Sequence, residues 1–129
     1  MQTRLAHRIN VNFNIIFRVC ADPQRKFAIV SGKSLECKAF DISELGVGLS
    51  SKYFFPKGLM LDMKIDGSLF GLREAMNIRG EVRYCIFNRS YGYRSGIKFI
   101  DLADKYHRSI AKFIGENERR KDLRVQISD

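Results

Sequence analysis

Two arginines near the start of the chain are spaced so that their guanidinium groups can act on one ligand. Arg4 and Arg8 enclose the tripeptide LAH and precede the first alternating apolar segment. Four extended residues span about 13 Å, which is enough to place two guanidinium groups on different parts of a nucleotide-sized ligand. The planar guanidinium fork matches phosphate oxygens and paired acceptors on a base edge, and lysine cannot copy this match. This segment is the first candidate for a binding site.

The same R-x-x-x-R spacing occurs in two other places, so spacing alone does not select the N-terminal pair. Arg79 and Arg83 fall on the outward face of an expected strand, and Arg120 and Arg124 lie in a charged C-terminal stretch. Both pairs are explained as solvated surface, because basic residues are mostly exposed. The N-terminal pair precedes the first strand and has no apolar face of its own, which favours a binding role.

A second group of polar residues lies in the stretch 39–50, AFDISELGVGLS. Asp41 supplies a carboxylate acceptor, and Ser43 supplies a hydroxyl that donates or accepts. Gly46 allows a positive φ and a close approach of the backbone to a ligand. Each residue taken singly is also typical of an Asx or Ser turn, which is the structural alternative. Taken together with the arginine pair, the three residues favour a binding site.

Catalytic and metal-binding motifs are absent from the sequence. There is no G-x-S-x-G, H-E-x-x-H, Walker loop or G-x-G-x-x-G before a helix, and GVG at 46–48 is too short for a phosphate loop. Three cysteines and two histidines are scattered along the chain: Cys20, Cys37, Cys85, His7 and His107. This scatter argues against a disulfide framework or a zinc site and for a reducing compartment. We therefore expect a protein of the cytoplasm that is not an enzyme and holds no metal.

The composition is that of one folded domain with a strong positive charge. The chain has 129 residues, of which 45% are hydrophobic and 29% charged, and its net charge is +9. No apolar run approaches the roughly 18 residues that a membrane span needs. The charge should attract phosphates, although basic residues alone more often form solvated faces. We expect a single domain over residues 1–129 without a membrane span.

Apolar alternation predicts a fold made mainly of strands. Residues 9–19, INVNFNIIFRV, place apolar side chains at every second position, as in a half-buried antiparallel strand. Shorter alternating stretches follow at 35–39, 59–65, 78–86 and 97–99. In 78–86 the alternation assigns Tyr84 to the same face as Val82 and Ile86, which predicts core packing. These strands indicate a small closed barrel or a sandwich.

One helix is expected after the strands. Residues 103–118 have apolar side chains at helical spacing, so an amphipathic helix should cover an end or edge of the sheet. The charged tail over 119–129 either extends this helix or frays.

The arginine pair and the Asp-Ser-Gly stretch occur in an order that resembles the PilZ family of cyclic di-GMP receptors. The motifs read RLAHR at 4–8 and DISELG at 41–46, separated by a strand. A third stretch, GIKFIDL at 96–102 before the helix, is similar to the last strand and the start of the C-terminal helix of that family. The resemblance covers roughly residues 4–115.

For the fold, the resemblance implies an all-β domain, a six-stranded antiparallel PilZ-type β-barrel with a C-terminal α-helix. The expected organisation of the chain is a flexible N-terminal arginine segment over 1–8, the barrel over 9–101, the helix over 103–118 and the charged tail over 119–129.

For function, the resemblance implies a non-catalytic receptor or adaptor that binds cyclic di-GMP, changes its surface and passes the signal to an unidentified downstream protein. The implied ligand-binding residues are Arg4, Arg8, Asp41, Ser43 and Gly46. Their chemistry suits guanine, since arginine matches the N7 and O6 acceptors and a carboxylate accepts from N1 and N2. No cofactor or metal is expected.

Two other functions remain open from the sequence. One is a PilZ-like protein-interaction module that does not use the ligand, and the other is a small basic barrel that binds RNA or single-stranded DNA. Sequence-specific nucleic-acid recognition is not expected. Thr3 stands where many family members carry a basic residue, which favours one ligand per chain and a monomer over a dimer. His7, inside the arginine segment, either contacts ligand or faces solvent.

Overall fold

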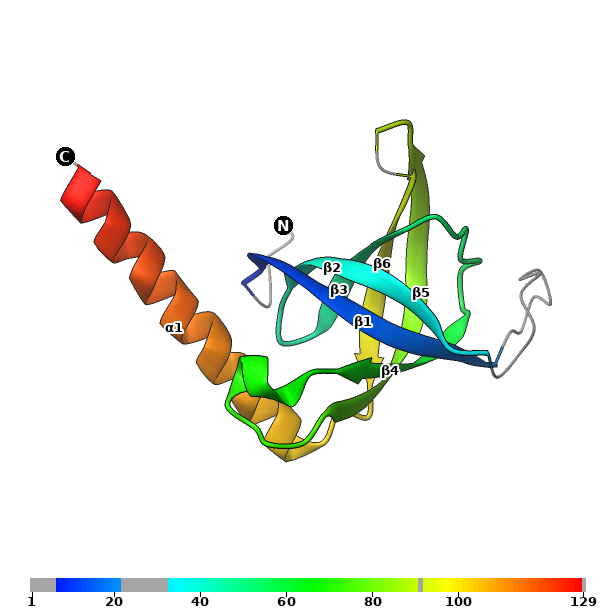
Figure 1. The fold of residues 1–129 in the computed structure, drawn as a ribbon, viewed down its shortest axis with the longest axis horizontal. Coiled ribbons are helices and arrows are strands. Elements are labelled where there is room, and N and C mark those ends of the chain that lie inside the picture. Colours follow the sequence, from blue (N-terminus) through cyan, green and yellow to red (C-terminus); the bar gives the residue numbers. More distant parts are fainter. Residues whose placement is uncertain (1–6, 22–32, 91, 129) are drawn as a thin grey trace, which may run out of the picture.

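The structure is a computed structural model in which a closed six-stranded barrel is followed by one long helix (Figure 1). It describes residues 7–21, 33–90 and 92–128, with side chains over 7–20, 33–90 and 92–118. The strands pair antiparallel in the order β1-β2-β3-β6-β5-β4, and β4 pairs with β1 to close the barrel. This topology confirms the predicted fold class.

The barrel strands are β1 (Ile9–Ala21), β2 (Leu35–Ile42), β3 (Gly46–Ser51), β4 (Met60–Ile65), β5 (Met76–Asn88) and β6 (Gly92–Ile100). A short 3₁₀ helix, η1 (Gly67–Phe70), joins β4 to β5, and α1 (Asp104–Ser128) follows β6. The alternation pattern missed β3, because its sequence GVGLSS has small residues on the outward side. Four of its six residues are buried all the same.

β1 forms a half-buried strand because apolar side chains occupy every second position, as the sequence predicts. Ile15, Phe17 and Val19 point into the barrel and are buried, whereas the residues between them are exposed. The other five strands contribute inward apolar side chains in the same way, and together these fill the barrel as one core. Burial of this apolar surface is the main stabilising contribution to the fold.

β5 departs from the predicted register near its end. A β-bulge lies between Val82 and Tyr84, so the residues after it face opposite to the alternation. Val82 is fully buried, but Tyr84 is 47% exposed and Ile86 is 61% exposed. The prediction that Tyr84 and Ile86 pack in the core is therefore wrong, and both side chains lie on the outer surface.

α1 packs against η1 and covers one end of the barrel with its first turns. Ile110 and Ile114 are buried, and the rings of Phe70 and Phe113 lie 4.7 Å apart. Figure 1 shows the rest of α1 extending away from the barrel, and its backbone is helical to Ser128. The helix is thus longer than the predicted 103–118, and the charged tail extends it.

None of the helices in the described part of the chain is both long enough and apolar enough to cross a membrane.

Candidate functional site

The register between β1 and β2 brings the arginine segment to the Asp-Ser-Gly stretch. Ile9 pairs with Ile42, and Asn10 pairs with Asp41. Arg8, which directly precedes β1, therefore lies beside the end of β2, although 33 residues separate it from Asp41 along the chain. The pairing of the first two strands is what joins the two motifs.

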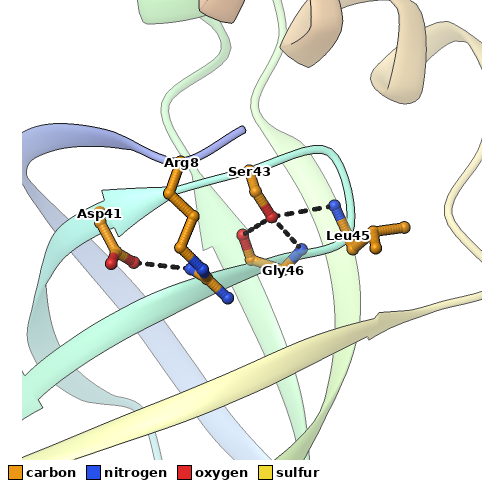
Figure 2. A network of polar contacts seen from close by, with 5 residues as sticks. All are labelled: Arg8, Asp41, Ser43, Leu45 and Gly46. Atoms are coloured by element: carbon orange, nitrogen blue, oxygen red, sulfur yellow. Dashed lines mark hydrogen bonds and ion pairs between the residues drawn. The ribbon is translucent and has the colours of Figure 1, made fainter. Parts of the chain in front are cut away.

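Arg8 and Asp41 form an ion pair on the outer surface (Figure 2). Arg8 Nη1 donates to Asp41 Oδ1 at 2.8 Å, and the two side chains are 38% and 20% exposed. With the described residues, neither side chain makes a further hydrogen bond. Within the described part of the chain, most of the arginine fork and the second carboxylate oxygen thus have no partner, and the site can offer donors and an acceptor side by side.

Ser43 holds the turn that follows Asp41. Its Oγ accepts from the backbone N–H of Leu45 and of Gly46 at 3.2 Å, and it lies 3.4 Å from the carbonyl of Gly46 (Figure 2). The backbone N–H of Ser43 donates to the same carbonyl at 2.9 Å. Because Ser43 is 2% exposed, its hydroxyl is committed to the loop. The Ser turn foreseen as the alternative is what Ser43 forms.

Gly46 is required for close packing and not for an unusual backbone angle. The glycines with positive φ among the described residues are Gly58, Gly71 and Gly92, so the expectation of a positive φ at Gly46 is wrong. A Cβ at Gly46 would collide with the backbone carbonyl of Ile97 on β6. Gly46 therefore fixes the approach of β3 to β6 just below the turn.

A second glycine, Gly48, leaves the space that the Asp41 side chain occupies. Gly48 pairs with Asp41 across β2 and β3, and a Cβ there would lie 2.5 Å from Asp41 Oδ1 and 2.6 Å from Phe40 Cζ. Arg94 Cζ lies 4.2 Å from the centre of the Phe40 ring, in a cation–π contact. Phe40, Gly48 and Arg94 were missed from the sequence, and together they extend the surface beside the ion pair.

Gly96 on β6 pairs with Gly48, so two glycines face each other across neighbouring strands. The ring of Tyr84 lies over Gly96 and occupies the space that a Cβ would need. Isolated glycines within strands often mark a close approach of other groups to the backbone. The glycines of GVG at 46–48 and RSG at 94–96 are the sequence features that could have indicated this surface. The surface runs from Asp41 over Gly48 and Gly96 to Tyr84.

Other predicted site residues are not brought together by the described part of the chain. Arg4 and Thr3 lie outside the described residues. His7 Nδ1 lies 3.5 Å from Glu118 Oε1 on α1, and the His7 side chain is 81% exposed. The His7 contact that the structure describes is thus with the helix.

No group of three or more His, Cys, Asp or Glu side chains among the described residues is placed to hold a metal ion. His107 Nε2 lies 3.0 Å from Glu44 Oε1, so Glu44 pairs with the helix. Burial raises the pKa of the Cys37 thiol to about 12, which makes it a poor nucleophile at neutral pH.

A groove of about 840 Å³ lies away from the ion pair, on the outer surface of β1, β4 and β5. Arg18, Lys64 and Arg79 contribute to its lining, and Arg79 Nε donates to Asp62 Oδ1 at 3.1 Å. The sequence predicts that Arg79 lies on the solvated surface, and its exposed position confirms this.

Comparison with known proteins gives one match to a family model and several to solved structures. The model of the PilZ domain matches residues 2–116. An uncharacterised protein of Aquifex aeolicus is 35% identical over 77 residues, which cover 57% of this chain and 34% of that protein. The chain therefore spans about a third of that relative.

The similar solved structures share the fold at low identity. YcgR from Escherichia coli in complex with c-di-GMP (cyclic di-GMP) has a TM-score of 0.68 at 14% identity, covering 99% of this chain and 51% of that chain. The PilZ domain of YcgR with c-di-GMP has a TM-score of 0.63 at 12% identity, covering 97% and 98%.

A third similar structure comes from another bacterium. The Bacillus subtilis inhibitor of motility, MotI/DgrA, has a TM-score of 0.66 at 13% identity, covering 94% of this chain and 54% of that protein. The chain thus spans about half the length of the longer structures and nearly all of the isolated domain. With the family model matching most of its residues, the chain belongs to the PilZ domain family.

Proposed function

We propose that the chain is a receptor for cyclic di-GMP, with its binding site on the outer surface around the Arg8–Asp41 pair. The observation that carries the proposal is the 2.8 Å contact that joins the arginine segment to the Asp-Ser-Gly stretch. The two similar YcgR structures contain c-di-GMP, which supports this choice of ligand.

Guanine chemistry fits the groups that lie together here. Arg8 donates to the N7 and O6 acceptors of one guanine, and Asp41 accepts from the N1 and N2 donors of a base. Arg4 supplies the second guanidinium group. Ser43 and Gly46 act mainly by shaping the loop below Asp41, and a direct contact between Ser43 and the ligand stays a prediction.

The aromatic side chains beside the pair extend the proposed site. Tyr84 is exposed over the glycines, and Phe40 is partly exposed beneath Arg94. The exposed Tyr84 ring offers an apolar face to a purine. Cyclic di-GMP carries two phosphates, so the net charge of +9 also favours its approach.

Ligand binding would change the surface that the chain presents to a downstream protein. Arg8 contacts Asp41, and His7 contacts Glu118 on α1. Guanine binding competes for the Arg8 and Asp41 groups, so the start of the chain must rearrange around the ligand. One ligand per chain and a monomer follow from Thr3 and belong to the same proposal.

Isothermal titration calorimetry with cyclic di-GMP tests the proposal and gives the stoichiometry. Arg8→Lys keeps the charge but loses the fork, so we expect it to weaken binding by about 1–3 kcal/mol. Arg79→Lys is the matched control, because Arg79 forms a similar pair with Asp62 on the groove side of the barrel. We expect its affinity to equal that of the wild type.

Three results would contradict the proposal. The first is no heat of binding for the folded wild type at tens of micromolar. The second is equal loss of affinity in Arg8→Lys and Arg79→Lys. The third is tight, strongly salt-dependent binding to generic RNA or single-stranded DNA with no preference for the cyclic dinucleotide, which would favour a nucleic-acid binder.

A further inference from the structure

Exposed apolar side chains gather where the β5–β6 hairpin extends past the barrel. Phe54 is 50% exposed, Ile86 is 61% exposed and Phe87 is 62% exposed. The ring of Tyr93 lies 5.9 Å from Phe54 and 5.3 Å from Phe87, so it links these two rings into one cluster, and Ile86 directly precedes Phe87 in the strand. We call these four residues the hairpin patch. Contiguous exposed apolar surface of this kind marks an interaction site.

The hairpin patch protrudes from the molecule. Ile86 and Phe87 are neighbours in one strand, so their side chains point to opposite faces, yet both are more than half exposed. Such exposure on both faces means that the barrel interior does not cover this end of the hairpin. Figure 1 agrees, since the β5–β6 hairpin extends well beyond the other strands. The patch is therefore a projecting apolar tip and not the wall of a groove.

The chain around the hairpin patch is basic and lacks carboxylates. The stretches 45–61 and 82–100 contain no Asp or Glu, although the whole chain has 14. Their basic residues include Lys52 and Arg89, which are both exposed. Lys52 lies next to Tyr53 and close to Phe54 in sequence, and Arg89 follows Phe87 in the hairpin. An apolar tip with basic flanks, in two stretches of chain that contain no carboxylate side chain, complements an anionic surface.

The shape and ring geometry favour a lipid surface over a nucleic acid. Single-stranded nucleic acids stack on open ring faces along a groove. Here Tyr93 meets Phe54 at 66° and Phe87 at 62°, so the rings contact one another edge to face. A protruding tip with phenylalanine and isoleucine, flanked by lysine and arginine, instead suits insertion at the headgroup level of an anionic bilayer.

We propose that the hairpin patch, with Lys52 and Arg89 beside it, attaches the protein reversibly to membranes rich in anionic lipid. The attachment is peripheral and needs no membrane-spanning segment. The patch adjoins the proposed ligand site, since Ile86 is two residues from Tyr84 on β5 and pairs with Arg94 on β6. None of the side chains that test the attachment is proposed to bind cyclic di-GMP; they are Lys52, Phe54, Phe87 and Arg89. Loss of vesicle binding in these variants and loss of cyclic di-GMP binding in Arg8→Lys are therefore separate results, and failure of one proposal can be told from failure of the other.

Co-sedimentation with vesicles tests the apolar part of this proposal. We expect the wild type to bind vesicles of equal parts phosphatidylglycerol and phosphatidylcholine, and not vesicles of phosphatidylcholine alone. The double variant Phe54→Ser, Phe87→Ser should bind at least about tenfold more weakly. The control is Leu45→Ser, Leu69→Ser, which removes two side chains that are 50% and 41% exposed elsewhere. The control should bind as the wild type does.

A tryptophan reporter tests insertion independently. The chain has no tryptophan, so Phe87→Trp places a single reporter in the hairpin patch. We expect its emission to shift to shorter wavelength with anionic vesicles. Leu69→Trp, in η1, should show no shift. An unchanged emission of Phe87→Trp while the protein sediments with the vesicles would overturn the proposal.

The charged part has its own matched pair of variants. Lys52→Gln, Arg89→Gln should weaken vesicle binding by roughly twenty-fivefold, about fivefold for each charge. Arg18→Gln, Lys64→Gln removes the same charge from the groove and should have a much smaller effect. Circular dichroism checks that each variant is folded. Absence of wild-type binding to anionic vesicles, or equal losses in the two charge variants, would overturn the proposal, and the first result would point to a protein partner for the patch.

Discussion

Gly48 and Gly46 are two residues apart on β3, yet an added methyl group would meet different neighbours at each. At Gly48 the nearest atoms belong to the side chains of Asp41 and Phe40, at 2.5 and 2.6 Å. At Gly46 the nearest atom is the backbone carbonyl oxygen of Ile97. Side chains can rotate away from a new Cβ, whereas a paired strand cannot. Alanine substitution should therefore separate the binding site from the fold.

Gly48→Ala should weaken ligand binding and leave stability nearly unchanged. The new methyl group forces the Asp41 carboxylate away from Arg8 and breaks their 2.8 Å contact. This pair is partly exposed, so its loss costs at most about 1 kcal/mol of stability. Replacing glycine in a strand by alanine gains about 0.5–1 kcal/mol, so the two changes nearly cancel. Affinity for cyclic di-GMP should fall by about 1–3 kcal/mol, because a guanine edge loses a well-placed partner.

Gly46→Ala should instead destabilise the protein. Overpacking of this kind costs typically about 1–3 kcal/mol, since β3 must move away from Ile97 on β6. Urea unfolding followed by circular dichroism measures the stability of both variants, and calorimetry measures their affinity. The reasoning is refuted if Gly48→Ala binds cyclic di-GMP as the wild type does, or if it is as unstable as Gly46→Ala.

Three further predictions concern the core and its ionisation. Ile110→Ala should lower the free energy of unfolding by about 2–5 kcal/mol, because this fully buried side chain docks α1; Ile16→Ala, at an exposed position, is the control in the same urea titration. A thiol reagent should modify exposed Cys20 in the folded protein and buried Cys37 only after unfolding, as mass spectrometry of timed samples would show. The pKa of the Cys37 thiol is raised in the folded state from 9.0 to about 12. The neutral thiol therefore contributes fully to the free energy of unfolding below pH 9, and this contribution is lost as the pH rises towards 12. Cys37→Ala should thus lose less stability than the wild type between these pH values; equal losses would contradict this reasoning.

The parts of the fold that depend on regular alternation could be predicted from the sequence. β1 is the clearest case, since Ile15, Phe17 and Val19 point inward as expected. The association of Arg8 with the stretch around Asp41 was also predicted, and the register of β1 and β2 provides it. Both follow from local patterns or from motifs whose order along the chain carries the information.

The errors arise where one residue changes the register or where a glycine has two possible uses. The bulge after Val82 turns Tyr84 outward, and nothing in the apolar alternation marks a bulge. Gly46 was assigned a positive φ, whereas it is needed for contact with a strand that lies about 50 residues later along the chain. Close approaches between distant segments are decided by the tertiary structure, so one sequence does not show them.

The closed barrel limits how this molecule can meet other proteins. Each of the six described strands pairs with a neighbour on both sides over part of its length, so the closed part of the barrel offers no open edge to which a partner could add a strand. Beyond its pairing with β4, β5 is paired on one side only, over Tyr84–Asn88. Recognition over the closed part must then be made by side chains on the outer surface and by the segments at either end of the barrel. Substitutions at those side chains can alter partner choice without cost to the backbone pairing, and the barrel thus serves as a constant support for surfaces that are free to diverge.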